Sequence, residues 1–251
     1  MTPARRITLI TGAGRGIGAA TARLCAAQGH DLALGYARDA GAAEALAEEL
    51  RALGRRVLCV QADVADEAQV LAMFARIDAE LGRLSGLVNN AGIVAPAARL
   101  DEMGVARWQR LFGVNVIGSL LCAREAVKRM STRHGGAGGA IVNLSSRAAQ
   151  LGSPGVYVDY AASKGAVDSL TIGLARELIG EGIRVNGVRP GIIATEIHAD
   201  SGTVDGLAAA AAGIPIGRLG RADEIAEAIV WLLSDAASYT VGATLDVAGG
   251  R

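Results

Sequence analysis

The stretch TGAGRGIG, residues 11–18, points most directly to the fold of this chain. It follows an apolar run, RITLIT (6–11), and leads into a segment of helical period (17–28). Glycines between a strand and a helix let the backbone turn tightly and approach a pyrophosphate, whose charge is favoured at a helix N-terminus. A lone glycine motif also fits a flexible turn, so the prediction of a nucleotide-binding site depends on the segments around it.

Outside this turn, short aliphatic runs alternate with longer stretches of helical period. The runs are apolar throughout, as in strands that helices cover on both faces. Strands are predicted at 6–11, 31–36, 57–60, 86–90, 140–145, 183–188 and 243–248, and helices at 17–28, 40–53, 67–81, 105–130, 157–180 and 222–234. The glycine-rich stretch 134–140 fits a loop better than a linker, and no repeat divides the chain. The sequence therefore predicts one α/β domain, residues 1–251, with a doubly wound parallel sheet.

Composition excludes several classes of protein. Twenty-five basic residues balance twenty-five acidic ones and only 3% of residues are aromatic, so neither nucleic acid nor a membrane is expected as a partner. The three histidines show no metal-ligand spacing, and no metal site is predicted. Three cysteines in apolar runs are predicted to be buried thiols of a soluble cytoplasmic protein.

The stretch YVDYAASKG (157–165) places a tyrosine four residues before a lysine. On a helix, Tyr160 and Lys164 are neighbours on one face. A phenol has a pKa near 10, and a cation roughly 4–5 Å away lowers that pKa by about 2–3 pH units. Tyr160 could then exchange a proton with a substrate oxygen near neutral pH. Tyr157 has no comparable partner and is expected to line the substrate pocket or to pack there.

The glycine spacing, G-x-x-x-G-x-G, resembles that of the short-chain dehydrogenase/reductase family rather than the more common G-x-G-x-x-G. Further motifs of that family follow in order along nearly the whole chain. They are Asp63-Val64, Asn89-Asn90-Ala91-Gly92, Asn115, Ser145-Ser146, Tyr160-x-x-x-Lys164, Pro190-Gly191, Thr195 and the closing VGATLDVAGG (241–250). The resemblance implies a Rossmann-type sheet of about seven parallel strands, a nicotinamide cofactor and a homotetramer or homodimer.

The same resemblance implies the roles of four catalytic residues. Tyr160 would be the acid/base, and Lys164 would lower its pKa and bind the nicotinamide ribose. Ser146 would donate a hydrogen bond to the substrate carbonyl oxygen, where charge develops. Asn115 would support a water that connects Lys164 to solvent. An asparagine in a helical apolar run costs about 0.7 kcal/mol relative to alanine, which predicts a buried partner for Asn115.

The position of the serine departs from the family pattern. The family places its serine thirteen residues before the tyrosine, and this chain has Arg147 there. Ser146 follows the strand alignment of IVNLSS (141–146), and a one-residue insertion in the turn-prone QLGSPG (150–155) can absorb the difference. We assign Ser146 and keep Ser145 as the alternative.

NADP(H) is the preferred cofactor, with NAD(H) possible. A carboxylate about 20 residues after the glycines selects NAD, whereas an arginine accommodates a 2′-phosphate. Asp39 lies at that distance but precedes a helical run, so it fits a helix cap better. NADP(H)-dependent members of the family carry a basic residue at one or both of the places that Arg15 and Arg38 occupy here. By resemblance, these arginines would contact the 2′-phosphate. By resemblance, the cofactor would contact Gly12, Arg15, Gly16, Ile17, Gly18, Tyr36, Arg38, Asp63, Val64, Asn90, Ala91, Gly92, Tyr160, Lys164, Pro190, Gly191, Ile193 and Thr195.

Asp63 has two possible roles. Asp66 and Gln69 form a better capping box for the helix at 67–81, which leaves the Asp63 carboxylate free. By resemblance, that carboxylate would contact the adenine amino group. A capping role for Asp63 is the alternative.

The substrate side is less defined. By resemblance, residues 194–216 form a substrate lid, and Gln150, Leu151, Ser153, Tyr157 and His198 are candidates for the pocket wall. None of these five supplies the cation pair that a carboxylate or phosphate would favour, so a neutral carbonyl or alcohol is expected. A sugar or alcohol dehydrogenase that uses NAD, and a cofactor-binding sensor or scaffold without turnover, are the alternatives.

Overall fold

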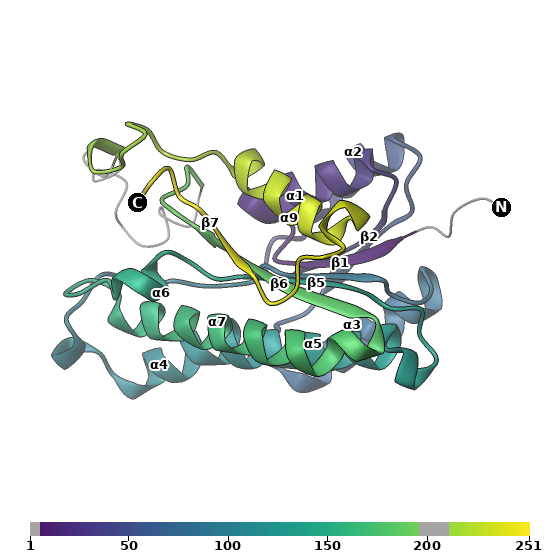
Figure 1. Ribbon diagram of the computed structural model, residues 1–251, viewed down its shortest axis with the longest axis horizontal. Coiled ribbons are helices and arrows are strands. Elements are labelled where there is room, and N and C mark those ends of the chain that lie inside the picture. The colour runs from purple at the N-terminus through teal and green to yellow at the C-terminus, as the bar shows by residue number, and fades with distance from the viewer. Residues whose placement is uncertain (1–5, 196–210) are drawn as a thin grey trace.

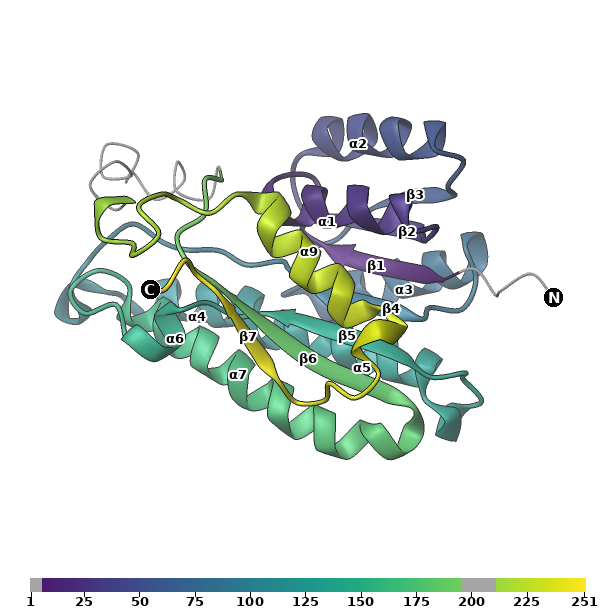
Figure 2. The ribbon, with the colours of Figure 1, turned by 45° about the horizontal axis from the view of Figure 1, so that its top comes forward.

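The computed structural model describes residues 6–195 and 211–251, and a sheet of seven parallel strands runs through its middle (Figures 1 and 2). The strands are β1 (Ile7–Thr11), β2 (Asp31–Tyr36), β3 (Val57–Gln61), β4 (Gly86–Asn89), β5 (Gly139–Leu144), β6 (Ile183–Pro190) and β7 (Thr244–Val247). Every predicted strand is present, with bounds that differ by at most two residues. Their order in the sheet is β3-β2-β1-β4-β5-β6-β7, and each neighbouring pair is parallel. The predicted doubly wound α/β fold is confirmed.

Helices cover both faces of the sheet. Helices α1 (Gly16–Ala27), α2 (Ala40–Ala52) and α9 (Ala222–Leu233) lie on one face, and α3 (Glu67–Glu80), α5 (Gly118–Met130) and α7 (Val158–Leu178) lie on the other (Figure 1). Successive strand residues point to opposite faces, so Leu9 packs into the core layer under α3 and α5 while Ile10 packs into the layer under α1 and α9. This is why the strands are apolar throughout.

The predicted helix at 105–130 is wrong in one respect, because it is not continuous. Helix α4 (Val105–Phe112) passes into a π-helical turn, Gly113–Ile117, before α5 begins at Gly118. The turn contains Asn115. A short helix that was not predicted, α6 (Ala148–Leu151), follows the serine pair at the end of β5.

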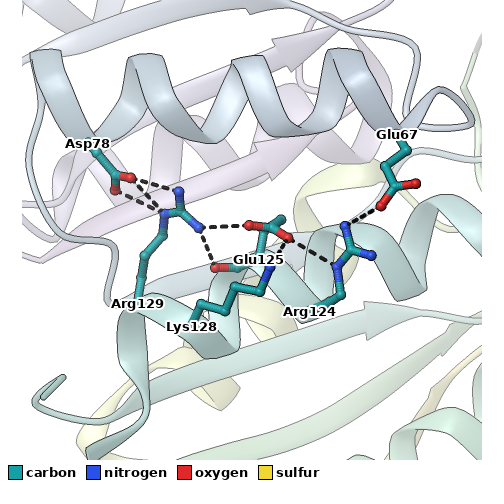
Figure 3. Close-up of polar contacts among 6 residues, drawn as sticks. All are labelled: Glu67, Asp78, Arg124, Glu125, Lys128 and Arg129. Atoms are coloured by element: carbon teal, nitrogen blue, oxygen red, sulfur yellow. Dashed lines mark hydrogen bonds and ion pairs between the residues drawn. The ribbon is translucent and has the colours of Figure 1, made fainter. Parts of the chain in front are cut away.

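Ion pairs fasten α5 to α3 (Figure 3). Arg129 contacts Asp78 at 2.7 Å, and Arg124 contacts Glu67 at 2.8 Å. Between these pairs the Glu125 side chain is only 4% exposed, and its carboxylate contacts three cations, Arg124, Lys128 and Arg129. The guanidinium of Arg129 also lies 4.9 Å from the ring centroid of Phe74 on α3. The helix that follows Asn115 is therefore held rigidly against its neighbour.

The sequence also makes predictions about the cysteines, about metal ions and about membrane spans. The three cysteines are buried thiols, as predicted, and burial raises the pKa of Cys25 and Cys122 to about 12. Within residues 6–195 and 211–251, no group of three or more histidine, cysteine or carboxylate side chains could hold a metal ion. None of the described helices combines the length and apolar character that a membrane span needs.

Candidate active site

The strand order reverses between β1 and β4, and in such sheets ligands bind at the carboxyl ends of the strands beside that point. The glycine turn lies there. Gly12 and Gly16 have φ values of 65° and 55°, a region that favours glycine. A Cβ on Gly18 would lie 2.4 Å from the Gly12 carbonyl oxygen. All three motif glycines are therefore required by geometry.

The Asn90 side chain ties the glycine turn to β4. Its Nδ2 donates to the carbonyl oxygens of Thr11 and Gly12, both at 2.9 Å. In return, the Thr11 hydroxyl oxygen accepts from the backbone N–H groups of Asn90 and Ala91 at 3.1 and 3.0 Å. These bonds fix the two strand ends against each other. The family motifs predict Asn90 and Ala91 at the site, whereas Thr11 appears in the sequence only as the end of β1 and the start of the glycine stretch, with no role for its side chain.

The first turn of α1 suits a phosphate group. Arg15 stands at the N-cap position but makes no side-chain cap, and no acidic residue lies in the first turn. Gly16 and Ile17 open the helix, whose first N–H groups lack intrahelical partners. These residues fit the pyrophosphate of a dinucleotide.

The tip of β2 has the predicted arrangement. Tyr36 ends the strand, and Arg38 is exposed just beyond it. Asp39 is the N-cap of α2, and its carboxylate accepts from the N–H of Ala42 at 2.9 Å. The predicted capping role of Asp39 is confirmed.

Asp63 is engaged, which corrects the expectation that its carboxylate is left free. One oxygen accepts from the N–H of Ala65 at 3.0 Å, and the other accepts from Arg110 on α4 at 2.7 Å. Asp66 caps α3 by accepting from the N–H of Gln69, as predicted. The Gln69 side chain, however, accepts from the N–H of Asp63, because the N–H of Asp66 already donates to the Asp63 carbonyl oxygen. Val64, the next residue, is buried.

Tyr160 and Lys164 lie on α7, as predicted, and point toward the same place. The Lys164 Nζ is 5.7 Å from the centroid of the Tyr160 ring. The same Nζ donates to the Leu144 carbonyl oxygen at the end of β5, at 2.7 Å. Lys164 is thus buried and held by a neighbouring strand.

The two serines after β5 have different partners. The Ser146 side chain lies near Tyr160 and acts to lower the pKa of its phenol. The buried Ser145 hydroxyl instead donates to the backbone carbonyl oxygen of Lys164 at 3.0 Å. This geometry favours Ser146, the assigned residue, as the serine that faces a substrate.

Burial dominates the ionisation of the two α7 residues. It raises the pKa of the Tyr160 phenol, and the hydrogen bond with Ser146 opposes this rise. It also lowers the pKa of Lys164 to about 8, while the nearby Asp168 carboxylate acts in the opposite direction. The predicted lowering of the phenol pKa is therefore wrong for this structure, because loss of water disfavours the phenolate more strongly than its neighbours favour it.

Asn115 has the buried partners that its place in an apolar run predicted. Its Oδ1 accepts from the N–H of Ile93 at 2.8 Å, and its Nδ2 donates to the carbonyl oxygen of Ile93 at 3.0 Å and to the Ser163 hydroxyl at 3.1 Å. Gly92 lies between this amide and Lys164, since a Cβ there would be 3.4 Å from the Lys164 Nζ and 3.5 Å from the Asn115 Oδ1. The π-helical turn therefore places Asn115 beside Lys164 and braces the backbone after β4.

These residues surround a cavity of about 560 Å³. Its wall includes many of the predicted residues: Ile17, Asn90, Gly92, Ser145, Ser146, Leu151, Ser153, Tyr157, Tyr160, Lys164, Pro190, Gly191, Ile193 and Thr195. Gln150 is absent from the described lining, and His198 and most of the predicted lid lie outside the described residues. Arg147 and Arg251 line the cavity as well, and the sequence predicts neither of them there.

Comparison with known proteins identifies the relatives of this chain. Residues 12–251 match the sequence model of a family described as enoyl-(acyl carrier protein) reductase. The uncharacterised oxidoreductase YgfF of Escherichia coli (strain K12) is 50% identical over 98% of this chain and 99% of its own length. The cis-4-hydroxycyclohexanecarboxylate dehydrogenase of Sinomonas cyclohexanicum is 44% identical over 98% of this chain and 96% of its own.

Solved structures give the same assignment. A blue fluorescent protein from a metagenomic library, in complex with NADPH, is similar with a TM-score of 0.90 and 35% identity over 98% of this chain and 97% of that one. A mutant short-chain dehydrogenase/reductase of Serratia marcescens is similar with a TM-score of 0.90 and 33% identity over the same shares. The chain belongs to the short-chain dehydrogenase/reductase family. It is an oxidoreductase that acts on CH–OH or C=O groups, as predicted.

Arg147, at the position where the family places its serine, has structural partners of its own. The main-chain N–H of Arg147 donates to the carbonyl oxygen of Pro190 at 3.0 Å, and its guanidinium contacts Asp246 on β7 at 2.7 Å. Its side chain is thus held at β7. Arg147 therefore forms part of the cavity wall.

Proposed function

We propose that the protein is an NADP(H)-dependent oxidoreductase that transfers a hydride between the nicotinamide and a carbonyl or secondary alcohol. The catalytic residues would be Asn115, Ser146, Tyr160 and Lys164. The observation that supports this most strongly is that Ser146, Tyr160 and Lys164 line one large cavity. A substrate oxygen that enters between the Ser146 and Tyr160 hydroxyls can accept a hydrogen bond from both.

The Ser146 and Tyr160 hydroxyls would perform the proton half of the reaction. When bound, the nicotinamide supplies or accepts the hydride. In the reducing direction, the Ser146 hydroxyl orients the carbonyl oxygen, and the Tyr160 phenol donates a proton to it as negative charge develops there. Burial raises the pKa of this phenol, which keeps it in its proton-donating form at neutral pH.

Lys164 and Asn115 would return the proton to Tyr160. The Lys164 pKa of about 8 leaves its ammonium group mostly protonated at neutral pH, yet able to release a proton. Asn115 braces the backbone at Ile93 beside that ammonium, where the amide can support a water that leads to solvent. We expect activity to decline above about pH 8, because Lys164 then loses its charge.

The cofactor preference rests on the tip of β2. Arg38 is exposed there, Arg15 is exposed in the glycine turn, and the nearby Asp39 carboxylate is used to cap α2. A 2′-phosphate would meet basic groups rather than a free carboxylate. One similar structure contains NADPH, which is consistent with this preference. The adenine contact of Asp63 stays a proposal, in which its carboxylate would be shared with Arg110.

We propose a substrate that carries an anionic group as a candidate beside the neutral one expected from the sequence. Arg147, Lys164 and Arg251 line the cavity, and no aspartate or glutamate is among the described lining residues. The Arg147 guanidinium contacts Asp246, whereas the Arg251 guanidinium has no acid partner in the described chain. One relative is named for its action on a hydroxycyclohexanecarboxylate. We therefore propose oxo or hydroxy acids, held by Arg251, as first candidates.

A substrate screen tests the proposed function. Oxidation of NADPH and of NADH would be followed with 4-oxocyclohexanecarboxylate, its methyl ester, an oxoacyl thioester and simple ketones, and sugars would be run in reverse with NADP⁺. The proposal expects turnover of at least one carbonyl with a preference for NADPH, and a higher kcat/KM for the free acid than for its ester. NADPH binding without turnover of any substrate would instead favour the sensor or scaffold reading.

We also propose that the protein is a homotetramer in the cytoplasm. Ile117 and Leu120 on the π-turn and α5 are 50% and 44% exposed, and Trp231 on α9 is 41% exposed. Exposed apolar side chains on helices are typical of buried interfaces between subunits. Light scattering coupled to size exclusion should give about four times the 25.5 kDa mass of the chain. A monomeric mass would contradict this assembly without affecting the catalytic proposal.

A further inference from the structure

A nearly buried ion pair joins α4 to the residue that precedes Tyr160 on α7. The Arg107 guanidinium on α4 grips the Asp159 carboxylate on α7 with two bonds, from Nε at 2.7 Å and from Nη2 at 3.1 Å. The Asp159 side chain is 3% exposed and that of Arg107 is 17% exposed. Arg107 holds the pKa of the Asp159 carboxyl below its usual range, against the effect of burial. Two parallel bonds of this kind fix the angle between partners as well as their separation.

The third nitrogen of the same guanidinium binds the loop after β4. The Arg107 Nη1 donates to the carbonyl oxygen of Pro96 at 2.5 Å. That loop contributes Val94 to the cavity wall. Two residues beyond Pro96, the N–H of Ala98 donates to the carbonyl oxygen of Val156 at 3.1 Å. The loop is thereby tied to the segment that enters α7.

The carboxylate end of the pair touches the catalytic helix directly. The Asp159 Oδ1 accepts from the N–H of Tyr160 at 2.9 Å. Asp159 lies in the first turn of α7, where a negative charge favours the helix. The segment just before it supplies Ser153, Val156 and Tyr157 to the cavity wall. One guanidinium thus connects α4, the loop after β4 and the first turn of α7.

We propose that Arg107 is a positioning residue, and that its clamp on Asp159 and Pro96 holds the Tyr160 phenol against Ser146 and fixes the substrate wall. Arg107 does not line the cavity and would act through Asp159. The proposal rests on the proposed function, because it gives Tyr160 the proton transfer. Arg107→Lys would keep the positive charge but would lose the planar guanidinium that binds Asp159 and Pro96 through separate nitrogens.

Steady-state kinetics of the full-length protein test the clamp. We expect Arg107→Gln to lower kcat for ketone reduction by about 10- to 100-fold, since a displacement near 1 Å costs rates of this order. The KM for NADPH should stay within about twofold, because the glycine turn lies on the other side of the site. Arg107→Lys should fall between Arg107→Gln and wild type. Asp159→Asn should resemble Arg107→Gln, and the double variant should be no worse than either single one, since the two residues act as one unit.

A matched control separates this effect from general loss of an ion pair. Arg23 makes the same two-bond contact with Glu49, through Nε and Nη2, on the exposed surface of α1 and α2. Arg23→Gln should leave kcat within about twofold of wild type. If Arg107→Gln does not fold, Arg107→Lys and Asp159→Glu give the same comparison at smaller amplitude.

A second readout does not depend on turnover. The ionisation of Tyr160 can be followed by ultraviolet absorbance as the difference between each protein and its Tyr160→Phe counterpart. We expect Arg107→Gln to move the midpoint down toward that of an exposed tyrosine, because a loosened ring gains water. A variant with unchanged midpoint and with kcat within about twofold of wild type would overturn the clamp. Absence of turnover in the wild type would refute the proposed function alone, and the absorbance shift would still decide the clamp.

Discussion

The roles of single residues beside the reversal of strand order, between β1 and β4, depend on distances that the sequence alone does not give. The spacing of Gly12, Gly16 and Gly18 predicted a nucleotide turn, and the structure gives the reason for each glycine. Two of them adopt a positive φ, and the third allows α1 to approach the Gly12 carbonyl oxygen. The Thr11 hydroxyl accepts hydrogen bonds from the backbone N–H groups of Asn90 and Ala91. This role could not be predicted, because it exists only when β1 and β4 pair.

Gly18→Ala should weaken NADPH binding by at least about tenfold, since the new Cβ would lie 2.4 Å from a backbone oxygen that cannot move away without deforming the turn. Fluorescence titration with NADPH measures this. Gly173 on α7 is the control, because a Cβ there meets nothing within 4 Å. Gly173→Ala should bind NADPH normally and gain up to about 1 kcal/mol of stability from better helix propensity. Equal affinity in the two variants would contradict the role of the turn.

At the scale of elements, most boundaries followed from apolar runs and caps, and the failures lie beside the site. The run at 105–130 has continuous helical period, so nothing in it marked the π-helical turn at Gly113–Ile117. That turn is stabilised by bonds from Asn115 to Ile93 and Ser163, which lie on other elements. Asn115 was the only sign of an irregularity in this run, and it predicted a buried partner but not a π-helical turn. Rare π-helical turns are frequent at functional sites, which fits this position.

Asn115→Ala should lower the free energy of unfolding by about 2–3 kcal/mol, because the N–H and C=O groups of Ile93 lose their partners. Urea unfolding measures this. Ser163→Ala removes only one of the bonds to the Asn115 side chain and should cost less than about 1.5 kcal/mol. An Asn115→Ala protein as stable as the Ser163→Ala protein would contradict the bracing role.

At the scale of the whole molecule, the order of the seven strands could be expected only through family resemblance, because periodicity gives strands but not their neighbours. The same limit explains why the sequence did not predict two arginines at the cavity. Arg147 and Arg251 are far apart in sequence and meet at the cavity because β5 and β7 end on the same edge of the sheet. Ionisation depends on the whole fold in the same way, since burial reversed the predicted direction for the Tyr160 pKa.

Stability should fall in acid as the buried ion pairs lose their carboxylates. The pKa values of Glu125 and Asp159 are both held below their usual range by neighbouring cations. Their contribution is therefore complete above their unfolded pKa values near 4 and is lost as the pH falls through the lower folded values. Urea midpoints should be level from pH 7 to about pH 5 and decline below about pH 4. A Glu125→Gln and Asp159→Asn double variant should show a shallower decline, and an unchanged slope would contradict this assignment.

The proton transfer assigned to Tyr160 is tested most directly by replacing each tyrosine of the cavity with phenylalanine. Tyr157 is the internal control, since it lines the same cavity but its hydroxyl is buried without a hydrogen-bond partner. For a ketone that the wild type reduces, Tyr160→Phe should lower kcat by at least about 100-fold while the Kd for NADPH changes by less than about threefold, and Tyr157→Phe should keep most of the activity. A Tyr160→Phe protein that reduces the ketone at a rate close to that of the wild type would contradict the account.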